Sequence, residues 1–235
     1  MHSAGPSKPL VVAVDGTSGS GKSSVSKQAA HRLGLRYLDT GAMYRAMTWW
    51  MLQHGVDVDD AETVAALAGK PEIVSGTDPL APTIVVDGQD VAEPIRTRTV
   101  TNAVSAVSAV PEVRHRLVAM QRLEIERAAA SGGIVVEGRD IGTVVAPHAT
   151  AKLYLTASPE ARAARRSAEI NGDPGATAEV TRQELLRRDA KDSGRKASPL
   201  AKAGDAEEID TTELTLEEVV ERAVETILKR AAVEG

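Results

Sequence analysis

The chain has 235 residues, of which 42% are hydrophobic, so it can bury one sizeable core in one or two domains. Its net charge is −5, only 2% of its residues are aromatic and it contains no Phe, a composition that argues against nucleic acid as a partner. It also contains no Cys, which excludes disulfides and thiolate zinc sites and fits a cytoplasmic protein.

The predicted elements begin with a buried strand. Residues 1–8 are polar and contain Pro and Gly, and we expect them to form a flexible tail. The apolar run Leu10–Val14 is too short for a signal peptide or a membrane span, so no membrane partner is expected. Because it is rich in β-branched residues and ends abruptly at Asp15 and Gly16, it predicts a strand buried on both faces of a parallel sheet.

A phosphate-binding loop follows this strand. The residues GTSGSGKS at 16–23 match the pattern G-x-x-x-x-G-K-[ST], between the strand and a helix predicted over residues 22–33. In such loops the backbone N–H groups and the helix N-terminus bind phosphate oxygens, the lysine reaches the β- and γ-phosphates, and the serine ligates Mg²⁺. The loop indicates a nucleotide-binding protein without specifying its reaction. The predicted binding residues are Gly16, Thr17, Ser18, Gly19, Ser20, Gly21, Lys22, Ser23 and Ser24.

Two segments interrupt the alternation of strands and helices. Residues 73–100 contain an Asp87-Gly88 pair, which predicts a hairpin over residues 83–91 in a small antiparallel insert. Residues 160–202 are highly charged and contain seven Arg, which is unusual for a core element.

Further strands are predicted at 37–38, 134–136, 153–155 and 208–209, which gives a five-stranded parallel sheet. A capping box of Thr215 and Glu218 predicts the start of the final helix.

Two further motifs carry a resemblance to a known family. The sequences DTGAMYR at 39–45 and EGRDIGTVV at 137–145, together with the phosphate-binding loop, closely resemble bacterial cytidylate kinases, which are P-loop nucleoside monophosphate kinases. The resemblance covers nearly the whole chain, including residues 105–122, 187–195 and 209–212. It implies an α/β fold with a single P-loop kinase domain at 9–235, containing a nucleoside monophosphate-binding insert at about 43–103 and a helical lid at about 161–197.

The resemblance also implies which residues bind the acceptor nucleotide, CMP or dCMP. Arg45 and Arg139 would grip its phosphate, and Thr40 would lie near the phosphate or the sugar. Arg forks match the oxygens of a phosphate monoester bidentately, although Arg45 alone could equally form a salt bridge on a helix surface. Asp140 and Arg188 would contact the sugar, and Ser105, Arg114 and Asp192 would contact the cytosine.

Asp192 has the clearest chemistry among the expected base contacts. A carboxylate accepts hydrogen bonds from the N4 amino group of cytosine, whereas uracil presents an acceptor at that position. Asp192 would therefore favour C over U, unless it is merely a solvated charge in the run 189–196. Its neighbour Lys191 stands where relatives often carry Arg, which keeps the charge but loses the fork.

Other charged residues suggest how a metal ion is held. Glu137 ends the predicted strand 134–136, where many P-loop enzymes carry an acid that, with the loop serine Ser23, holds Mg²⁺. Glu137 could instead orient the loop backbone, and Asp15 could either contact the metal or shape the phosphate-binding loop.

Lid arginines complete the predicted catalytic set. Arg162 and Arg166 share a helix face, and we expect at least one of them to reach the ATP phosphates. Arg165 would point elsewhere and pair with a carboxylate. The predicted catalytic residues are Lys22, Arg139, Arg162, Arg166 and Arg188.

We therefore expect a monomer that phosphorylates CMP and dCMP with ATP by in-line transfer. The alternatives are another small-molecule P-loop kinase, of the UMP/CMP, adenylate or shikimate type, and a regulatory P-loop NTPase. The hairpin insert argues against shikimate kinase, and the EGRD motif at 137–140 argues against adenylate kinase. No [NT]-K-x-D motif that would read guanine is present.

Overall fold

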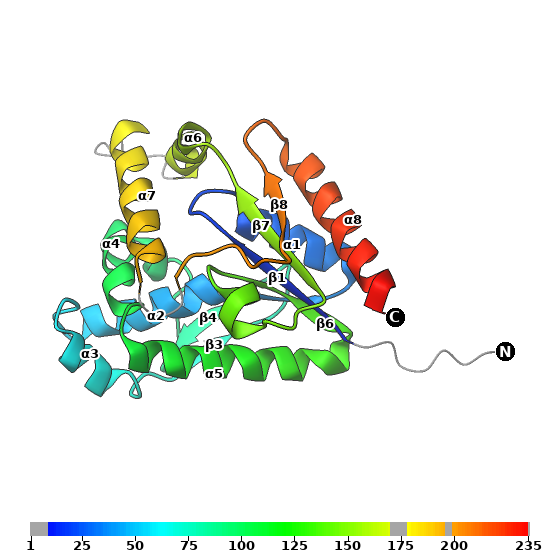
Figure 1. The fold of residues 1–235 in the computed structure, drawn as a ribbon. Helices are drawn as coiled ribbons and strands as arrows, with labels where there is room; N and C mark the ends of the chain where they lie inside the picture. Colours follow the sequence, from blue (N-terminus) through cyan, green and yellow to red (C-terminus); the bar gives the residue numbers. More distant parts are fainter. Residues whose placement is uncertain (1–8, 170–177, 196–198, 235) are drawn as a thin grey trace.

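A five-stranded parallel sheet forms the centre of the fold, as the sequence predicts (Figure 1). The structure, a computed structural model, describes residues 9–169, 178–195 and 199–234, so the expected tail at 1–8 and parts of the expected lid lie outside the described residues. In sheet order the strands are β2 (Arg36–Asp39), β6 (Gly133–Glu137), β1 (Leu10–Gly16), β7 (Ala151–Thr156) and β8 (Glu207–Asp210).

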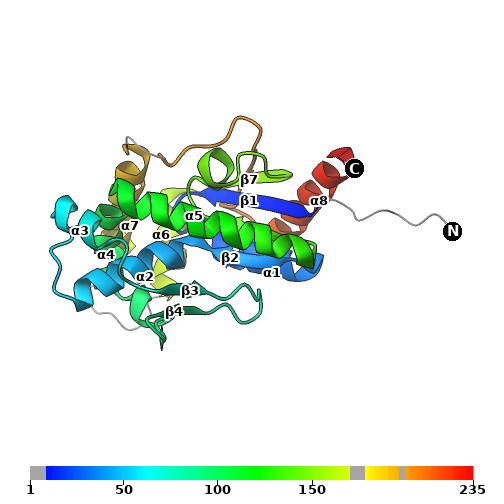
Figure 2. The same ribbon diagram turned by 90° about the horizontal axis from the view of Figure 1, so that it is seen from below.

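Helices cover both faces of this sheet, α1 (Lys22–Leu33) and α8 (Leu216–Glu234) on one face and α2 (Thr40–Gln53) and α5 (Pro111–Ala128) on the other. Val12 and Val14 of β1 pack with α1 and α8, whereas Ala13 between them packs with α2 and α5. Figure 2 shows α5 running across its face of the sheet. Residues 10–14 of the strand are all apolar because both of its faces are buried.

The capping box predicted before α8 is present. The backbone N–H of Glu218 donates to Thr215 Oγ1 at 3.3 Å, and the backbone N–H of Thr215 donates to the Glu218 carboxylate at 2.8 Å. Two N–H groups that would otherwise lack partners at the helix start are thereby satisfied.

The insert between α2 and α5 contains α3 (Ala61–Leu67), β3 (Ile73–Ser75), β4 (Ile84–Val86), β5 (Gln89–Asp90), the 3₁₀-helix η1 (Pro94–Arg96) and α4 (Arg98–Val107). The predicted hairpin is confirmed, because β4 and β5 pair antiparallel around a turn in which Asp87 has a φ of 49° and Gly88 a φ of 80°. A third strand, β3, joins the hairpin, and Trp50 Nε1 donates to Asp87 Oδ2 at 2.7 Å, which fixes the turn to α2.

The charged segment folds into two helices, α6 (Pro159–Glu169) and α7 (Ala178–Ser193), which pack against each other. Because α7 also contacts α4, the two segments that interrupt the strand–helix alternation meet in space. The 3₁₀-helix η2 (Ala129–Ser131) precedes β6, and the short π-helix η3 (Ile141–Val145) follows it. Within the described ranges, no helix is long and apolar enough to cross a membrane.

Candidate functional site

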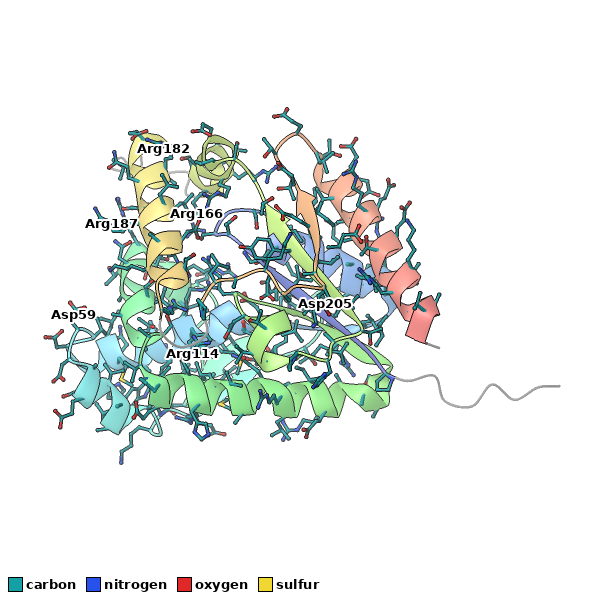
Figure 3. The ribbon with its side chains drawn as sticks, viewed as in Figure 1. Asp59, Arg114, Arg166, Arg182, Arg187 and Asp205 are labelled. Atoms are coloured by element: carbon teal, nitrogen blue, oxygen red, sulfur yellow. The ribbon has the colours of Figure 1, made fainter. Side chains whose placement is uncertain are left out.

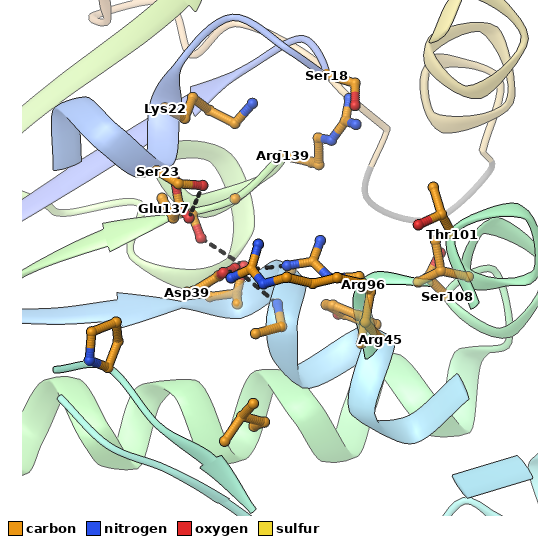
Figure 4. A pocket seen from close by; sticks show the side chains of 18 of the residues that line it. Ser18, Lys22, Ser23, Asp39, Arg45, Arg96, Thr101, Ser108, Glu137 and Arg139 are labelled. Carbon is orange, nitrogen blue, oxygen red and sulfur yellow. Dashed lines mark hydrogen bonds and ion pairs between the residues drawn. The ribbon is translucent and has the colours of Figure 1, made fainter. Parts of the chain in front are cut away.

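A cleft with a cavity of about 340 Å³ opens where the strands β1, β2 and β6 end. Because the carboxyl ends of parallel strands share one edge, the loops after these strands converge there. Lys22, Ser23 and Glu137 line one end of the cleft and Thr101 and Ser108 the other, with Arg45 and Arg139 projecting between them (Figure 4). The predicted site residues on its wall are Ser18, Gly19, Gly21, Lys22, Ser23, Ser24, Thr40, Arg45, Arg114, Glu137, Arg139, Asp140, Arg166, Arg188 and Asp192.

The phosphate-binding loop has the shape that its sequence predicts. Gly16 has a φ of 141°, and a Cβ there would lie 2.0 Å from the carbonyl oxygen of Leu155, so only glycine fits. α1 begins at Lys22, and Ser20 Oγ donates to Thr17 O at 2.9 Å, so these two residues shape the loop from within. The loop thus presents the N-terminus of α1 toward the cleft, where anions bind.

Lys22 is held at the base of the loop. Its Nζ donates to the carbonyl oxygens of Gly16 at 2.9 Å and Thr17 at 2.7 Å. Burial, together with the charge of Arg139, lowers the pKa of Lys22 to about 7, although the charge of Glu137 opposes this shift. Phosphate oxygens near Nζ would restore the charged form, because an anion nearby favours the ammonium.

Glu137 contacts both the phosphate-binding loop and a neighbouring strand. Its Oε1 accepts hydrogen bonds from Ser23 Oγ at 2.7 Å and from Tyr37 OH at 2.8 Å. Its Oε2 is buried and has no hydrogen-bond partner among the described residues. Burial and the charge of Asp39 raise the pKa of Glu137 to about 7. The unpaired oxygen beside the Ser23 hydroxyl fits Mg²⁺, which prefers oxygen ligands. In contrast, the contacts of the carboxylate do not support the alternative that it orients loop backbone.

Asp15 orients the loop after β6 rather than the phosphate-binding loop, which corrects one of the two roles that the sequence left open. Its Oδ1 accepts from the backbone N–H of Ile141 at 2.8 Å and its Oδ2 from that of Gly142 at 2.7 Å. Burial raises the pKa of Asp15 to about 6, although both hydrogen bonds act in the opposite direction. Asp15 thereby holds the start of η3, directly after Arg139 and Asp140.

Thr40 and Arg45 project from the start of α2. The Thr40 hydroxyl donates to the backbone oxygen of Glu137 at 2.7 Å, so it ties α2 to β6. Arg45 Nη2 pairs with Asp39 Oδ2 at 3.3 Å, but the Arg45 side chain is only 16% exposed and lies on the cleft wall. The salt-bridge alternative for Arg45 is therefore present, but not on the protein surface.

The expected base-contacting residues lie together at the end of the cleft near α4. Asp192 is 1% exposed and accepts a hydrogen bond from Ser105 Oγ at 3.4 Å. It also pairs with Arg195 and, at 3.3 Å, with Arg139 Nη2. The alternative that Asp192 is a solvated charge is thus wrong. Ser105 supports Asp192 from behind and does not line the cleft itself among the described residues.

Arg114 and Asp140 form a buried ion pair on the same wall. The Arg114 guanidinium also lies 5.4 Å from the ring centroid of Tyr44, and its Nη1 donates to Ser108 O at 3.3 Å. Burial and the charge of Arg139 lower the pKa of Arg188 to about 9; its Nε has no hydrogen bond among the described residues but lies 4.0 Å from Asp192 Oδ2 in an ion pair. Among the described residues, nine Lys and Arg side chains line the cleft against four carboxylates, so cations outnumber carboxylates on its wall.

The three arginines of α6 have different surroundings. Arg166 lies on the cleft wall, between α7 and the sheet in the view of Figure 3. Arg162 is buried behind the phosphate-binding loop, where its Nη1 donates to Ser18 O at 3.1 Å and also pairs with Asp189. Arg165 points elsewhere, as expected, and among the described residues its Nη1 donates to Thr211 Oγ1 at 2.8 Å rather than to a carboxylate. Lys191 is exposed.

Sequence reasoning missed several residues that support the site. Tyr37 contacts Glu137, and Asp39 contacts Arg45. At the acceptor end, Asp189 contacts Arg139, and Arg195 contacts Asp192. Asp39 stands in the DTGAMYR motif, and Asp189 and Arg195 stand in the segment 187–195, so the motifs contained the signal for these three. Nothing in the local pattern around Tyr37 distinguishes it from a core residue.

The comparisons with known proteins agree with this geometry. The family model for cytidylate kinase matches residues 12–229. A cytidylate kinase of Streptomyces griseus is 64% identical over 215 residues, which are 92% of this chain and 91% of that one. The cytidylate kinase of Streptomyces coelicolor is 61% identical, over 98% of this chain and 98% of that one. The cytidylate kinase of Geobacillus thermodenitrificans is 46% identical, over 94% of this chain and 97% of that one.

A likeness among solved structures supports the fold alone. A gluconokinase from Sinorhizobium meliloti superposes with a TM-score of 0.50 at 17% identity and covers 95% of this chain and 94% of that chain. The fold is therefore shared with a kinase of very different sequence. Its substrate says nothing about this chain, whereas the family model and the relatives match the sequence itself. The chain belongs to the cytidylate kinase family.

Proposed function

We propose that this chain transfers the γ-phosphate of ATP to CMP and dCMP. The observation that carries the proposal is Asp192, a buried carboxylate at the end of a cation-lined cleft whose other end is a phosphate-binding loop. A carboxylate at that position can accept from the amino group of cytosine while arginines nearer the loop hold the nucleotide's phosphate. The family membership supports the same reaction.

The donor would bind at the phosphate-binding loop, residues 16–24. Its backbone N–H groups and Lys22 would hold the β- and γ-phosphates, and Arg166 would reach the transferring group from the cleft wall. Arg162 would act from behind the loop through its contact with Ser18. Ser23 and Glu137 would hold Mg²⁺, which when bound neutralises charge on the phosphates.

The acceptor would bind across the cleft from the donor. Arg45, Arg139 and Arg188 would hold its phosphate, and Arg188 with Asp140 would contact its sugar. Thr40 lies beside them, and the Arg114 and Ser105 side chains would complete the base site around Asp192. No general base is required, because a phosphate monoester is already largely a dianion at pH 7. The protein's task is then to align the two phosphates and stabilise the charge between them.

The insert at about 43–103 and the helices at about 161–197 would close over both nucleotides and exclude water, which could otherwise hydrolyse ATP. Closure predicts slower hydrogen exchange in α6 and α7 when CMP is added with a non-hydrolysable ATP analogue. Unchanged exchange there would contradict closure. We further propose that the protein works in the cytoplasm as a monomer. Light scattering after size-exclusion chromatography tests the oligomeric state.

A phosphotransfer assay with CMP, dCMP, UMP, AMP and shikimate as acceptors tests the proposed reaction. We expect CMP and dCMP to give the highest kcat/KM. A preference for UMP or AMP would instead favour a UMP/CMP or adenylate kinase, and ATP hydrolysis unaffected by any acceptor would favour a regulatory NTPase. A Lys22→Ala variant serves as the inactive control in each assay.

A further inference from the structure

One carboxylate joins the two ends of the cleft. Asp189, on α7, has an Oδ1 that accepts from Arg139 Nη1 at 2.9 Å and from the backbone N–H of Ser18 at 3.2 Å. Its Oδ2 pairs with Arg162, which in turn donates to Ser18 O at 3.1 Å. Arg139 belongs to the proposed acceptor end, whereas Ser18 belongs to the phosphate-binding loop. A single oxygen atom therefore bridges the acceptor side and the donor side of the reaction.

The surroundings of Asp189 indicate that it is fixed rather than solvated. Its side chain is 13% exposed, and that of Arg162 is 5% exposed. Burial alone would raise the pKa of Asp189, but the charge and hydrogen bond of Arg139 hold it below its ordinary value, so the carboxylate stays ionised. Without this negative charge, Arg139 and Arg162 would be two like charges in a partly buried place, and each would lose a charge-assisted hydrogen bond.

Asp189 differs from Asp192, which lies one helical turn further along α7 and also pairs with Arg139, at 3.3 Å. Asp192 lies on the cleft wall, where it can touch a ligand. Asp189 is not among the described residues that line the cleft, so it reaches the reacting groups only through Arg139 and the loop. The two carboxylates hold the two terminal nitrogens of the Arg139 guanidinium, Nη1 and Nη2, which fixes the plane of the fork.

We propose that Asp189 is a positioning residue for phosphoryl transfer, whose carboxylate fixes Arg139 against the tip of the phosphate-binding loop and so sets the separation of donor and acceptor phosphates. The inference deepens the proposed function and rests on the role of Arg139 in holding the acceptor phosphate. In-line transfer is sensitive to this separation, since a misplacement of about 1 Å can cost on the order of 100-fold in rate. Ground-state binding depends on it much less.

The test is Asp189→Asn, which keeps the side-chain shape and removes the charge. We expect kcat to fall about 10- to 100-fold while the KM values for CMP and ATP change less than about threefold. Glu179→Gln is the matched control, because Glu179 is an exposed carboxylate on the same helix whose partners, among the described residues, are its near neighbours Arg182 and Gln183. It should behave as the parent. A kcat within threefold of the parent, or an effect confined to KM, overturns the proposal.

A double-mutant cycle separates positioning from general loss of structure. In an Arg139→Lys background, Asp189→Asn should lower kcat only slightly further, because the fork that Asp189 positions is already gone. In an Arg45→Lys background the full effect should remain, since Arg45 pairs with Asp39 instead. Equal losses in both backgrounds overturn the proposal. If Asp189→Asn fails to fold, Asp189→Glu keeps the charge but displaces it, and the same cycle applies.

The same variants distinguish failure of this inference from failure of the proposed function. If Arg139→Lys and Arg45→Lys leave phosphoryl transfer to CMP unchanged, the proposed acceptor site is wrong. If both variants impair transfer and Asp189→Asn does not, the acceptor site stands and only the positioning role of Asp189 is lost.

Discussion

The hydroxyl of Tyr37 donates a hydrogen bond of 2.8 Å to Glu137 Oε1, across the neighbouring parallel strands β2 and β6. Ser23 Oγ donates to the same oxygen at 2.7 Å, so both hydrogen bonds fall on Oε1, and Oε2 has no partner in the part of the chain that the structure describes. Tyr37 therefore orients, from the strand next to β6, the carboxylate that we propose as a metal ligand.

Tyr37→Phe tests this orientation. Removal of the hydroxyl should raise the Mg²⁺ concentration needed for half-maximal activity by about tenfold or more, because partners of a ligand typically change metal affinity 10- to 100-fold. The free energy of unfolding should fall by only about 1 kcal/mol. Tyr154→Phe is the matched control, since Tyr154 also lies on the sheet but donates no hydrogen bond to another described residue. An unchanged Mg²⁺ requirement in Tyr37→Phe would show that Tyr37 is only part of the core.

Lys22→Ala should abolish phosphoryl transfer without destabilising the fold. Nζ stabilises the transferring group in the proposed reaction, and loss of one such contact typically lowers kcat by about 100-fold or more. The side chain is a desolvated cation whose pKa is lowered to about 7, so relief of this desolvation offsets the loss of its hydrogen bonds to Gly16 O and Thr17 O, and the free energy of unfolding at neutral pH should change little. Steady-state kinetics and urea unfolding measure the two effects. Lys229→Ala, which removes an exposed side chain of α8, is the control, and substantial turnover by folded Lys22→Ala contradicts the assigned role.

Asp192 should determine the preference for cytosine over uracil. Asp192→Ala leaves the cytosine amino group without its acceptor, which should lower kcat/KM for CMP by roughly 5- to 150-fold, corresponding to about 1–3 kcal/mol. UMP gains nothing from the carboxylate and should change much less. Asp192→Asn can turn an amide N–H toward uracil O4, so its CMP/UMP ratio should fall furthest.

Because Asp192 also pairs with Arg139 and Arg195, both variants will disturb those arginines for either nucleotide. The ratio of kcat/KM for CMP to that for UMP is therefore the decisive measurement, since a general disturbance cancels in it. Asp205→Asn removes an exposed carboxylate that pairs with Lys152 and should keep the parent's ratio. If Asp192→Ala and Asp192→Asn keep it too, Asp192 does not contact the base.

The sequence predicted the parts of the fold that local patterns determine. The strand at 10–14, the loop at 16–23 and the Asp87-Gly88 turn each follow from residues adjacent in the chain, and all three are present. The partners of Arg165 and Asp15 were not predictable in this way, because Thr211 and η3 reach them only through the packing of β8 and β6. The same holds for the contacts of α7 with the phosphate-binding loop, which join residues far apart in the sequence.

The buried carboxylate of Asp15 should make the stability of the protein depend on pH. Its pKa is raised from 3.8 to about 6, chiefly by burial, so the ionised form is less stable in the folded chain than in the unfolded chain. A raised pKa means that the stability present below about pH 4 is lost as the pH rises through 6. The loss from this one group amounts to at most about 3 kcal/mol.

Asp15→Asn removes this titration while keeping an oxygen that can accept from Ile141 or Gly142. The variant will differ from the parent at every pH because one of these N–H groups loses its acceptor, so the absolute difference in stability is not informative. The informative quantity is its change with pH. Urea unfolding between pH 4 and 7 should show the parent losing stability relative to Asp15→Asn as the pH rises, with most of the change between pH 4 and 6. A difference that stays constant over this range, or one that grows in favour of the parent, would mean that the two backbone hydrogen bonds outweigh burial and that Asp15 is ionised throughout.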